Sequence, residues 1–394
     1  MDGGAFRVDL SRGLIPALLV QLLFGMFRFS VGVVLPYLSA EFLLSSGQAG
    51  IFVSAILIAT GVPMALTGYL YDTLGRSKTM ISGTAILTIG CILSTMSPSF
   101  TACLASFFIA SIGAGILTTS IFAFVGETTP NSRGLLLGLT SSMYSLGGFF
   151  GPLVATALTA TAGWRPPFQF LGLIGLLILA AQWSLLRGSD DTRTSQQTSP
   201  SRSTYAGLLR NSNVATLSIL LLLTNFAFLA TASWMTAFLL KHQGLEPNYA
   251  GLTFGLFSLA GMFGSLGLGA LSDRIGRKRI IGVSFFISVL LSCLLFERLW
   301  PSAPVAAIAI TFGFFVSPHW PLQTTLAQDS VDPALIGTVT GLVQNVGMIG
   351  GILGPGVAGA LMEAMDMGDA LLLTVSLPLM ISAIISILLR EKRR

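Results

Sequence analysis

Long apolar segments, separated by short polar turns, follow one another along almost the whole chain from about Leu14. Because an α-helix rises 1.5 Å per residue, about 20 apolar residues cross a hydrocarbon core about 30 Å thick. We therefore predict twelve membrane-spanning helices. They lie near residues 14–38, 46–71, 79–97, 100–125, 134–160, 167–187, 214–240, 248–272, 280–296, 303–327, 335–362 and 369–389. No sheet is expected, because an open edge would leave backbone groups unpaired in lipid.

A polar segment over residues 188–211 interrupts this pattern after the sixth span. It is rich in serine and threonine and has too few apolar residues to bury a core, which is typical of a flexible linker. The predicted organisation is an N-terminal six-helix bundle over residues 1–187, a cytoplasmic linker over 188–211 and a C-terminal six-helix bundle over 212–394.

The composition agrees with an all-α membrane protein. Hydrophobic residues make up 53% of the chain and charged residues only 9%, whereas soluble domains carry about 25% charged residues. The net charge of +5 is spread over short loops, which argues against nucleic acid as a partner. Cys91, Cys103 and Cys293 lie inside apolar segments without metal-ligand spacing, so we expect no metal and no cofactor.

A short charged turn occurs twice in the chain. Gly68 to Lys78 and Gly269 to Arg279 share the pattern G-x-L-x-D-x-x-G-R, at a constant offset of 201 positions. A pattern that returns at half the chain length indicates a duplicated fold. The two bundles are therefore predicted to be pseudo-symmetric.

The basic residues predict the orientation. On the proposed topology, 17 of the 21 lysines and arginines lie on the side of the two termini, both charged turns and the linker. Arg165, Lys241 and Arg298 lie on the other side, and Arg28 lies within a span. Since basic residues concentrate on the cytoplasmic side, we expect a multi-pass protein of the cell (inner or plasma) membrane with both termini in the cytoplasm.

These motifs resemble the major facilitator superfamily of secondary transporters, over essentially the whole chain. The segments that carry the resemblance are the two charged turns, Glu127 to Gly134, Gly163 to Phe168, Gly147 to Pro152 and Gly350 to Pro355. The resemblance implies two six-helix bundles that alternate access to a central site, in a protein that we expect to work as a monomer. The segment Gly147 to Pro152 is like the family's helix 5 signature, which is commonly linked with exporters.

The charged turns are candidates for a conformational latch. A carboxylate can lie against the positive N-terminal end of a helix, and the resemblance places Asp72 near the start of helix 11 and Asp273 near the start of helix 5. Arg76 and Arg277 would then pair with acids at the ends of helices 4 and 10. The latch residues are Asp72, Arg76, Glu127, Asp273, Arg277 and Asp329. The alternative is that they are ordinary interfacial charges.

Arg28 is the candidate substrate anchor. A charge near the middle of a span costs at least about 2.5–3.5 kcal/mol on insertion scales, so such groups are functional candidates. None of the sixteen acids lies deep in a predicted span, and the counterpart of Arg28 in helix 7 is Leu229. A guanidinium offers paired donors to an anion. We predict a small organic anion, such as a monocarboxylate; the alternative is an arginine that bonds backbone carbonyls or extends to the membrane surface.

Other polar side chains lie at a depth compatible with a substrate cavity. The candidates for substrate binding are Tyr144, Asn225, His319, Gln344 and Asn345, with Gln21, Gln169 and Gln323 at similar depth. Amides in membrane helices also hold helices together. His319 lies between Pro318 and Pro321, which loosen the helix. It is a candidate for carrying a coupling proton, or a structural histidine.

Glycines at four-residue spacing predict close helix packing. The pairs are Gly134 and Gly138, Gly147 and Gly151, and Gly337 and Gly341.

The sequence favours transport over other functions. It has no nucleotide-binding loop and no cluster of residues with acid-base or metal spacing, so we expect a secondary active or facilitative transporter, whether symporter or antiporter, rather than an enzyme. An exporter of hydrophobic or drug-like compounds is the alternative within transport. A membrane sensor that binds a solute without moving it is the alternative from another class.

Overall fold

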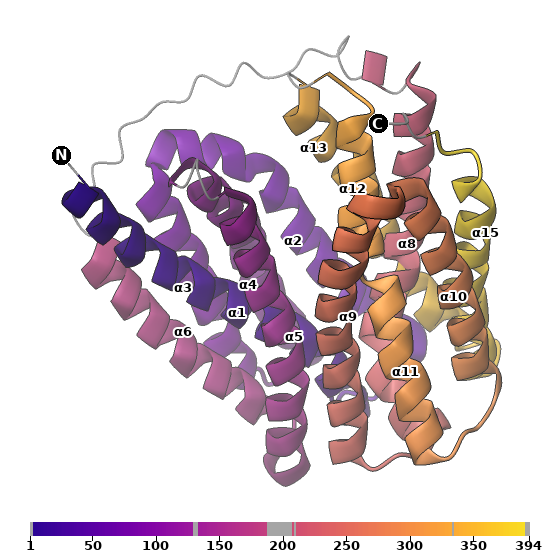
Figure 1. Ribbon diagram of the computed structural model, residues 1–394. Coiled ribbons are helices and arrows are strands. Elements are labelled where there is room, and N and C mark those ends of the chain that lie inside the picture. The colour runs from indigo at the N-terminus through magenta and orange to yellow at the C-terminus, as the bar shows by residue number, and fades with distance from the viewer. Residues whose placement is uncertain (1–2, 129–132, 187–206, 209, 333–334, 391–394) are drawn as a thin grey trace. The chain divides into compact units, whose positions relative to one another are not determined.

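The computed structural model describes residues 3–128, 133–186, 207–208, 210–332 and 335–390, and these residues form helices joined by short turns (Figure 1). The first six helices are α1 (Gly3–Glu41), α2 (Ser46–Leu74), α3 (Arg76–Thr95), α4 (Phe100–Thr128), α5 (Arg133–Ala162) and α6 (Arg165–Leu186). The later ones are α8 (Ser212–Ala237), η2 (Phe238–His242), α9 (Pro247–Ile275), α10 (Arg277–Glu297), α11 (Ser302–Val316), α12 (His319–Asp329), α13 (Ile336–Leu361), α14 (Met367–Leu371), η4 (Leu372–Ser376) and α15 (Leu377–Ser386).

Within the described residues, twelve spans are long and apolar enough to cross a membrane. This confirms the all-helical prediction. The tenth span is not one continuous helix: α11 ends at Val316, and α12 begins at His319 after the Ser317-Pro318 step. Since proline removes a backbone donor and clashes with the preceding turn, the break lies where the sequence places its prolines.

The two charged turns have the same backbone at the same motif position. Gly75 and Gly276 both have a positive φ, of 86° and 101° respectively. Only glycine adopts this region without strain. The repeated glycine therefore lets α2 end and α3 begin within one residue, and it does the same between α9 and α10.

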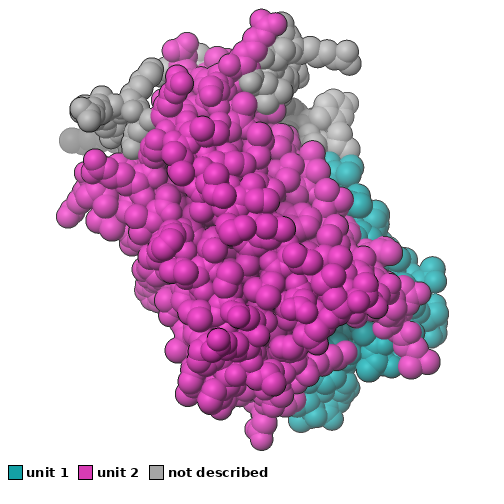
Figure 2. Space-filling view, turned by 90° about the vertical axis from the view of Figure 1, so that its right-hand side faces the viewer, with its two compact units in different colours: residues 1–42, 55–196 teal, residues 43–54, 197–394 magenta. Residues whose placement is uncertain are grey.

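The chain divides into two compact units, shown in different colours in Figure 2. Unit 1 consists of residues 1–42 and 55–196, and unit 2 of residues 43–54 and 197–394. The start of α2 thus groups with unit 2, which the sequence did not indicate. The predicted linker over 188–211 lies almost entirely outside the described residues and stays a prediction.

Glycines join α1 to α5 inside unit 1. A Cβ on Gly147 would lie 2.3 Å from the Leu22 carbonyl oxygen, and one on Gly151 would lie 2.6 Å from that of Met26. The Ser30 hydroxyl donates to the Gly151 carbonyl at 3.2 Å. The packing predicted for this glycine pair is confirmed, and it fixes the face that α1 turns towards α5.

In unit 2, α8 and α13 pack in the same way. A Cβ on Gly350 would lie 1.9 Å from the Leu222 carbonyl oxygen, and one on Gly354 would lie 2.2 Å from that of Phe226. The prediction for Gly341 is wrong: a Cβ there would meet nothing within 4 Å, because it does not face the α8 contact. Gly134, Gly138 and Gly337 lie outside the residues whose surroundings are described.

Candidate functional site

Arg28 lies within α1 in unit 1 and is buried, with 7% of its surface exposed. Its Nη2 atom has no hydrogen-bond partner among the described residues. Ion pairs among the described residues form at Arg165, His242 and Arg277, and none of them includes Arg28. A buried charge is normally stabilised by pairing or by hydrogen bonds. The described residues leave the Nη2 donor of Arg28 without such a bond.

Tyr144 of α5 is held next to this arginine. Its ring packs against Phe24 at 5.1 Å between centroids and against Phe29 at 5.8 Å. Its phenol interacts electrostatically with the Arg28 guanidinium. The close contact of Gly25 with the Tyr144 carbonyl positions this turn of α5. The Tyr144 hydroxyl therefore lies within the electrostatic range of the Arg28 cation.

A second polar cluster lies in unit 2. The Gln323 amide of α12 donates to the Thr224 hydroxyl of α8 at 3.2 Å, while its Oε1 is buried without a partner among the described residues. Asn225 follows Thr224 on α8 and is 6% exposed. Thr224 was not among the predicted residues, because an isolated threonine in an apolar helix gives no sequence signal. The cluster offers neutral donors and acceptors, and no charge.

His319 is fully buried at the start of α12. Its ring stacks on Phe285 of α10, with the centroids 3.8 Å apart and the planes at 16°. Neither ring nitrogen has a hydrogen-bond partner within the described residues. A buried histidine with two unsatisfied nitrogens is not held by hydrogen bonds as a structural histidine usually is.

The remaining predicted residues of this kind are less closely placed. Gln344 is half-buried and Asn345 exposed on α13. Of the other amides at similar depth, Gln21 is buried with Oε1 unpartnered among the described residues, and Gln169 is exposed. Within the described part of unit 2, no hydrogen bond joins Gln344 or Asn345 to the Gln323 and Thr224 pair.

One half of the predicted latch can be described. Arg277 of α10 donates through Nη2 to the Asp273 carboxylate at 3.0 Å and through Nη1 to Asp329. It therefore joins the end of α9 to the end of α12. The side chains of Asp72, Arg76 and Glu127 lie outside the described residues, and the latch role of all six stays a prediction.

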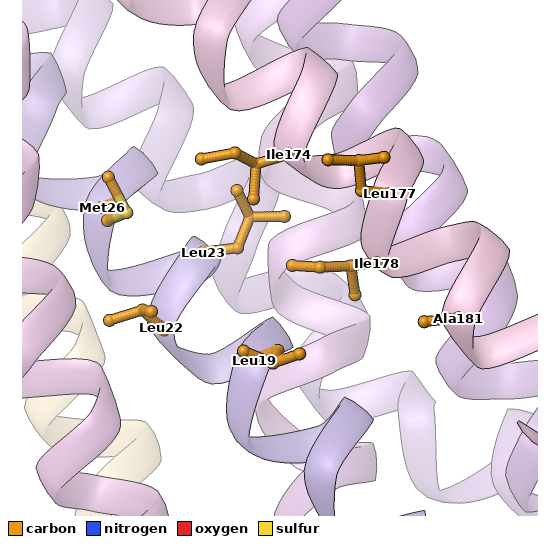
Figure 3. Close-up of a pocket in the computed structure, with 8 residues that line it drawn as sticks. All are labelled: Leu19, Leu22, Leu23, Met26, Ile174, Leu177, Ile178 and Ala181. Carbon is orange, nitrogen blue, oxygen red and sulfur yellow. The ribbon is translucent and has the colours of Figure 1, made fainter.

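An apolar groove of about 270 Å³ lies between α1 and α6 in unit 1 (Figure 3). Four residues of each helix line it: Leu19, Leu22, Leu23, Met26, Ile174, Leu177, Ile178 and Ala181. With no polar side chain in this lining, the groove has nothing to pair with a charged solute. It does not include Arg28, and we do not assign it to the substrate.

No group of three or more His, Cys, Asp or Glu side chains in the described parts of the chain is placed to hold a metal ion. The three cysteines are free, and Cys91 and Cys103 are buried.

The family model described as "Major Facilitator Superfamily" matches residues 17–355. The chain belongs to this family. It is therefore a multi-pass membrane transporter and not an enzyme, as the sequence motifs indicated.

Curated relatives are similar over most of their length. The probable sulfoacetate transporter SauU of Cupriavidus necator is 25% identical, over 90% of this chain and 86% of its own. The fosmidomycin resistance protein of Escherichia coli is 26% identical, over 88% of this chain and 85% of its own.

Solved structures share the fold of this family member. The nucleoside transporter NupG superposes with a TM-score of 0.82 at 15% identity, covering 98% of this chain and all of that one. A D-xylose–proton symporter gives a TM-score of 0.75 at 16% identity, covering 95% and 97%.

Proposed function

We propose that this protein carries a small organic anion across the membrane by alternating access, with Arg28 as the substrate anchor. The observation that carries the proposal is the buried Arg28 guanidinium, whose Nη2 has no partner among the described residues. Removing a cation from water costs several kcal/mol unless an opposite charge compensates it. A bound anion would supply that charge and would accept a charge-assisted hydrogen bond from Nη2.

The surroundings of Arg28 favour a substrate with one principal anionic group. Tyr144 adds a hydroxyl that can donate a further hydrogen bond to the same anion. The counterpart position in α8 is Leu229, whose Cδ1 lies 2.5 Å from where a Cβ on Gly351 would be. Because this residue is a leucine, the position in α8 that corresponds to Arg28 carries no cation. A carboxylate or sulfonate therefore fits the proposal better than a phosphate ester.

The polar residues of unit 2 belong to the same proposal. Asn225, Gln344, Asn345 and the Gln323 amide would bind uncharged parts of the solute. His319 would exchange a proton during the cycle, because neither of its ring nitrogens is bonded by a described residue. The relative named as a probable sulfoacetate transporter supports an organic anion in general, since sulfoacetate is one, but sulfoacetate carries two anionic groups and does not support a single one.

The test is uptake of radiolabelled carboxylates and sulfonates into proteoliposomes, with and without a pH gradient. We expect one or more of these anions to be transported, and Arg28→Ala to weaken transport at least about tenfold, because hydrogen bonds to charged groups are worth about 1.5–3 kcal/mol. Arg28→Lys keeps the charge but loses the planar guanidinium, so its transport should lie between that of the native protein and that of Arg28→Ala.

The matched control is Arg298→Ala, which removes an exposed arginine at the end of α10. It should transport like the native protein. Unchanged affinity for the transported anion in Arg28→Ala, in protein that elutes as a single species from gel filtration, contradicts the anchor role.

A second candidate function is export of hydrophobic or drug-like compounds, which the fosmidomycin resistance relative favours. Expression in a drug-sensitive host, followed by growth in a panel of such compounds, tests it. Resistance that persists in Arg28→Ala would favour this function over anion transport.

A further inference from the structure

The first turns of α2 dock on the C-terminal end of α13, within unit 2. The Gly47 backbone N–H donates to Glu363 Oε1 at 2.9 Å, across 316 positions of sequence. Two turns further along α2, the Ser54 hydroxyl donates to the Ile352 carbonyl at 2.6 Å. We call this contact, from Ser45 to Ser54 on one side and Ile352 to Glu363 on the other, the α2–α13 clamp.

The start of α2 is built to receive a carboxylate. Ser45 and Gln48 form a reciprocal cap, in which the Ser45 N–H donates to Gln48 Oε1 at 3.0 Å and the Gln48 N–H donates to Ser45 Oγ at 3.2 Å. Neither side chain of this cap accepts from the Gly47 N–H, which donates to Glu363 Oε1 instead. The Ser45 hydroxyl also bonds Glu363. A negative charge at this place is further stabilised by the helix dipole.

The rest of the clamp is backbone packed on backbone. A Cβ on Gly50 would lie 2.6 Å from the Pro355 carbonyl oxygen, and one on Gly359 would lie 2.3 Å from that of Ser46. At Gly50 and Gly359 the facing atoms of the other clamp helix belong to its backbone, and the one side chain nearby is Trp234 of α8. The two clamp helices can therefore separate there without rotamer changes of their own. The specific bonds of the clamp are those of Ser54 and Glu363, and Glu363 alone of these carries a charge.

The charged groups on the elements that pack around this end of α13 are few. Residues 46–54 of α2 and the whole of α8 contain no titratable side chain. η2 carries Lys241 and His242, and the turn into α14 carries Asp366 and Asp369. The His242 Nδ1 lies 3.4 Å from Asp366 Oδ2, which also accepts from the Gly368 N–H. Among the described residues, Glu363 is thus the acid of this region that bonds α2.

We propose that Glu363 is a closing residue of the transport cycle: as a carboxylate it holds the start of α2 on α13, and as a neutral acid it releases it. Residues 46–54 of α2 group with unit 2 and the rest of α2 with unit 1. Any movement of one unit against the other must therefore bend α2 or detach its start from α13. This inference rests on the family's transport function and not on the identity of the solute.

The direction of the pH effect follows from the bonds. The Ser45 hydroxyl, and then the Gly47 N–H, lower the pKa of Glu363 below its usual value in the clamped state. A group whose pKa is lowered in one state stabilises that state above its usual pKa, and the stabilisation is lost as pH falls through the lowered value. Because Glu363 is exposed, its proton comes directly from the aqueous phase.

Distances between spin labels test the proposal without knowledge of the substrate. Labels are placed at Ile51→Cys on α2 and Ala360→Cys on α13, two exposed positions, after replacement of the three native cysteines by alanine. In proteoliposomes at about pH 7 we expect a single short distance. A longer population should grow as the pH is lowered towards about 3.5, below the ordinary range of a glutamate.

Three variants decide the outcome. Glu363→Gln, which is neutral at every pH, should show at about pH 7 the long population that the native protein shows at the lowest pH, with no further pH dependence. Glu363→Ala should do the same. Asp366→Asn removes the neighbouring carboxylate that caps α14, and it should keep the native pH profile. The proposal is overturned if the distance distribution of the native protein does not change with pH. It is also overturned if the distribution of Glu363→Gln changes with pH as that of the native protein does.

Discussion

Arg165 and Glu41 form an ion pair that joins the start of α6 to the end of α1 in unit 1, with Nη2 and Oε1 2.7 Å apart. The same carboxylate accepts from the Trp164 indole at 2.7 Å, and Arg165 lies over that ring at 4.6 Å. Arg165 Nη2 also donates to the Ser97 carbonyl at 3.1 Å, which brings in the end of α3. One arginine thus fastens three helices at one end of the unit.

We expect Arg165→Lys to lower the stability of the folded protein, because lysine cannot bond the carboxylate and the carbonyl as a planar fork. The pair is partly exposed, so the loss should be small, about 0.2–1 kcal/mol. The measurement is a thermal unfolding midpoint in detergent, within a double-mutant cycle with Glu41→Gln. A cycle with no coupling between the two changes would show that the pair contributes nothing.

Gly350→Ala should destabilise the packing of α8 on α13. The new Cβ would meet the Leu222 carbonyl oxygen at 1.9 Å, and overpacking of this kind costs typically about 1–3 kcal/mol. Gly341→Ala is the matched control on the same helix, because a Cβ there meets nothing within 4 Å. It should be neutral or stabilising, by up to about 1 kcal/mol. Equal unfolding midpoints for the two variants would contradict the close packing of α8 on α13 at Gly350.

His319→Phe should leave the fold intact while it abolishes any stimulation of transport by a pH gradient. The aromatic ring can still stack on Phe285, and two unpartnered buried nitrogens are removed. We therefore expect a thermal midpoint equal to or above that of the native protein. Uptake with and without a pH gradient is the functional measurement. Gradient-stimulated uptake that survives in His319→Phe excludes this histidine as the proton carrier.

Arg277→Gln should loosen the junction between α9 and α12, because it removes the cation that Asp273 and Asp329 share. If the cluster is part of a latch, the variant should shift the carrier towards the state that is open at this end, and counterflow of the identified substrate should change in rate without loss of binding. Arg274→Gln, which changes a neighbouring exposed arginine, is the control. Unchanged counterflow in Arg277→Gln would indicate ordinary interfacial charges.

The sequence predicted the helices well because hydrophobic length is a strong signal in membranes. Residues Ser46 to Leu74 and Arg165 to Leu186, for example, were expected as spans to within a few residues. The spacing of Gly147 and Gly151 predicted a close helix contact, and the structure shows that the neighbour is α1. Gly341 shows that spacing alone does not say which face meets a neighbour. For the candidate site, the sequence singled out Arg28 and His319 because a polar group in an apolar helix is conspicuous. It missed Thr224, because a threonine in an apolar helix is not conspicuous.

By itself, the sequence determined the family, the twelve spans, the repeated turn with its glycine and Arg28 as the cation within the first span. All of these depend on local composition or on spacing along one helix. The tertiary structure alone decided two of the polar pairs, Gln323 with Thr224 and Glu363 with the start of α2, whereas the pair of Arg277 with Asp329 was expected from the family resemblance. Such pairs join residues that are far apart in the chain. They depend on how neighbouring helices face one another, and periodicity within a single helix does not encode that.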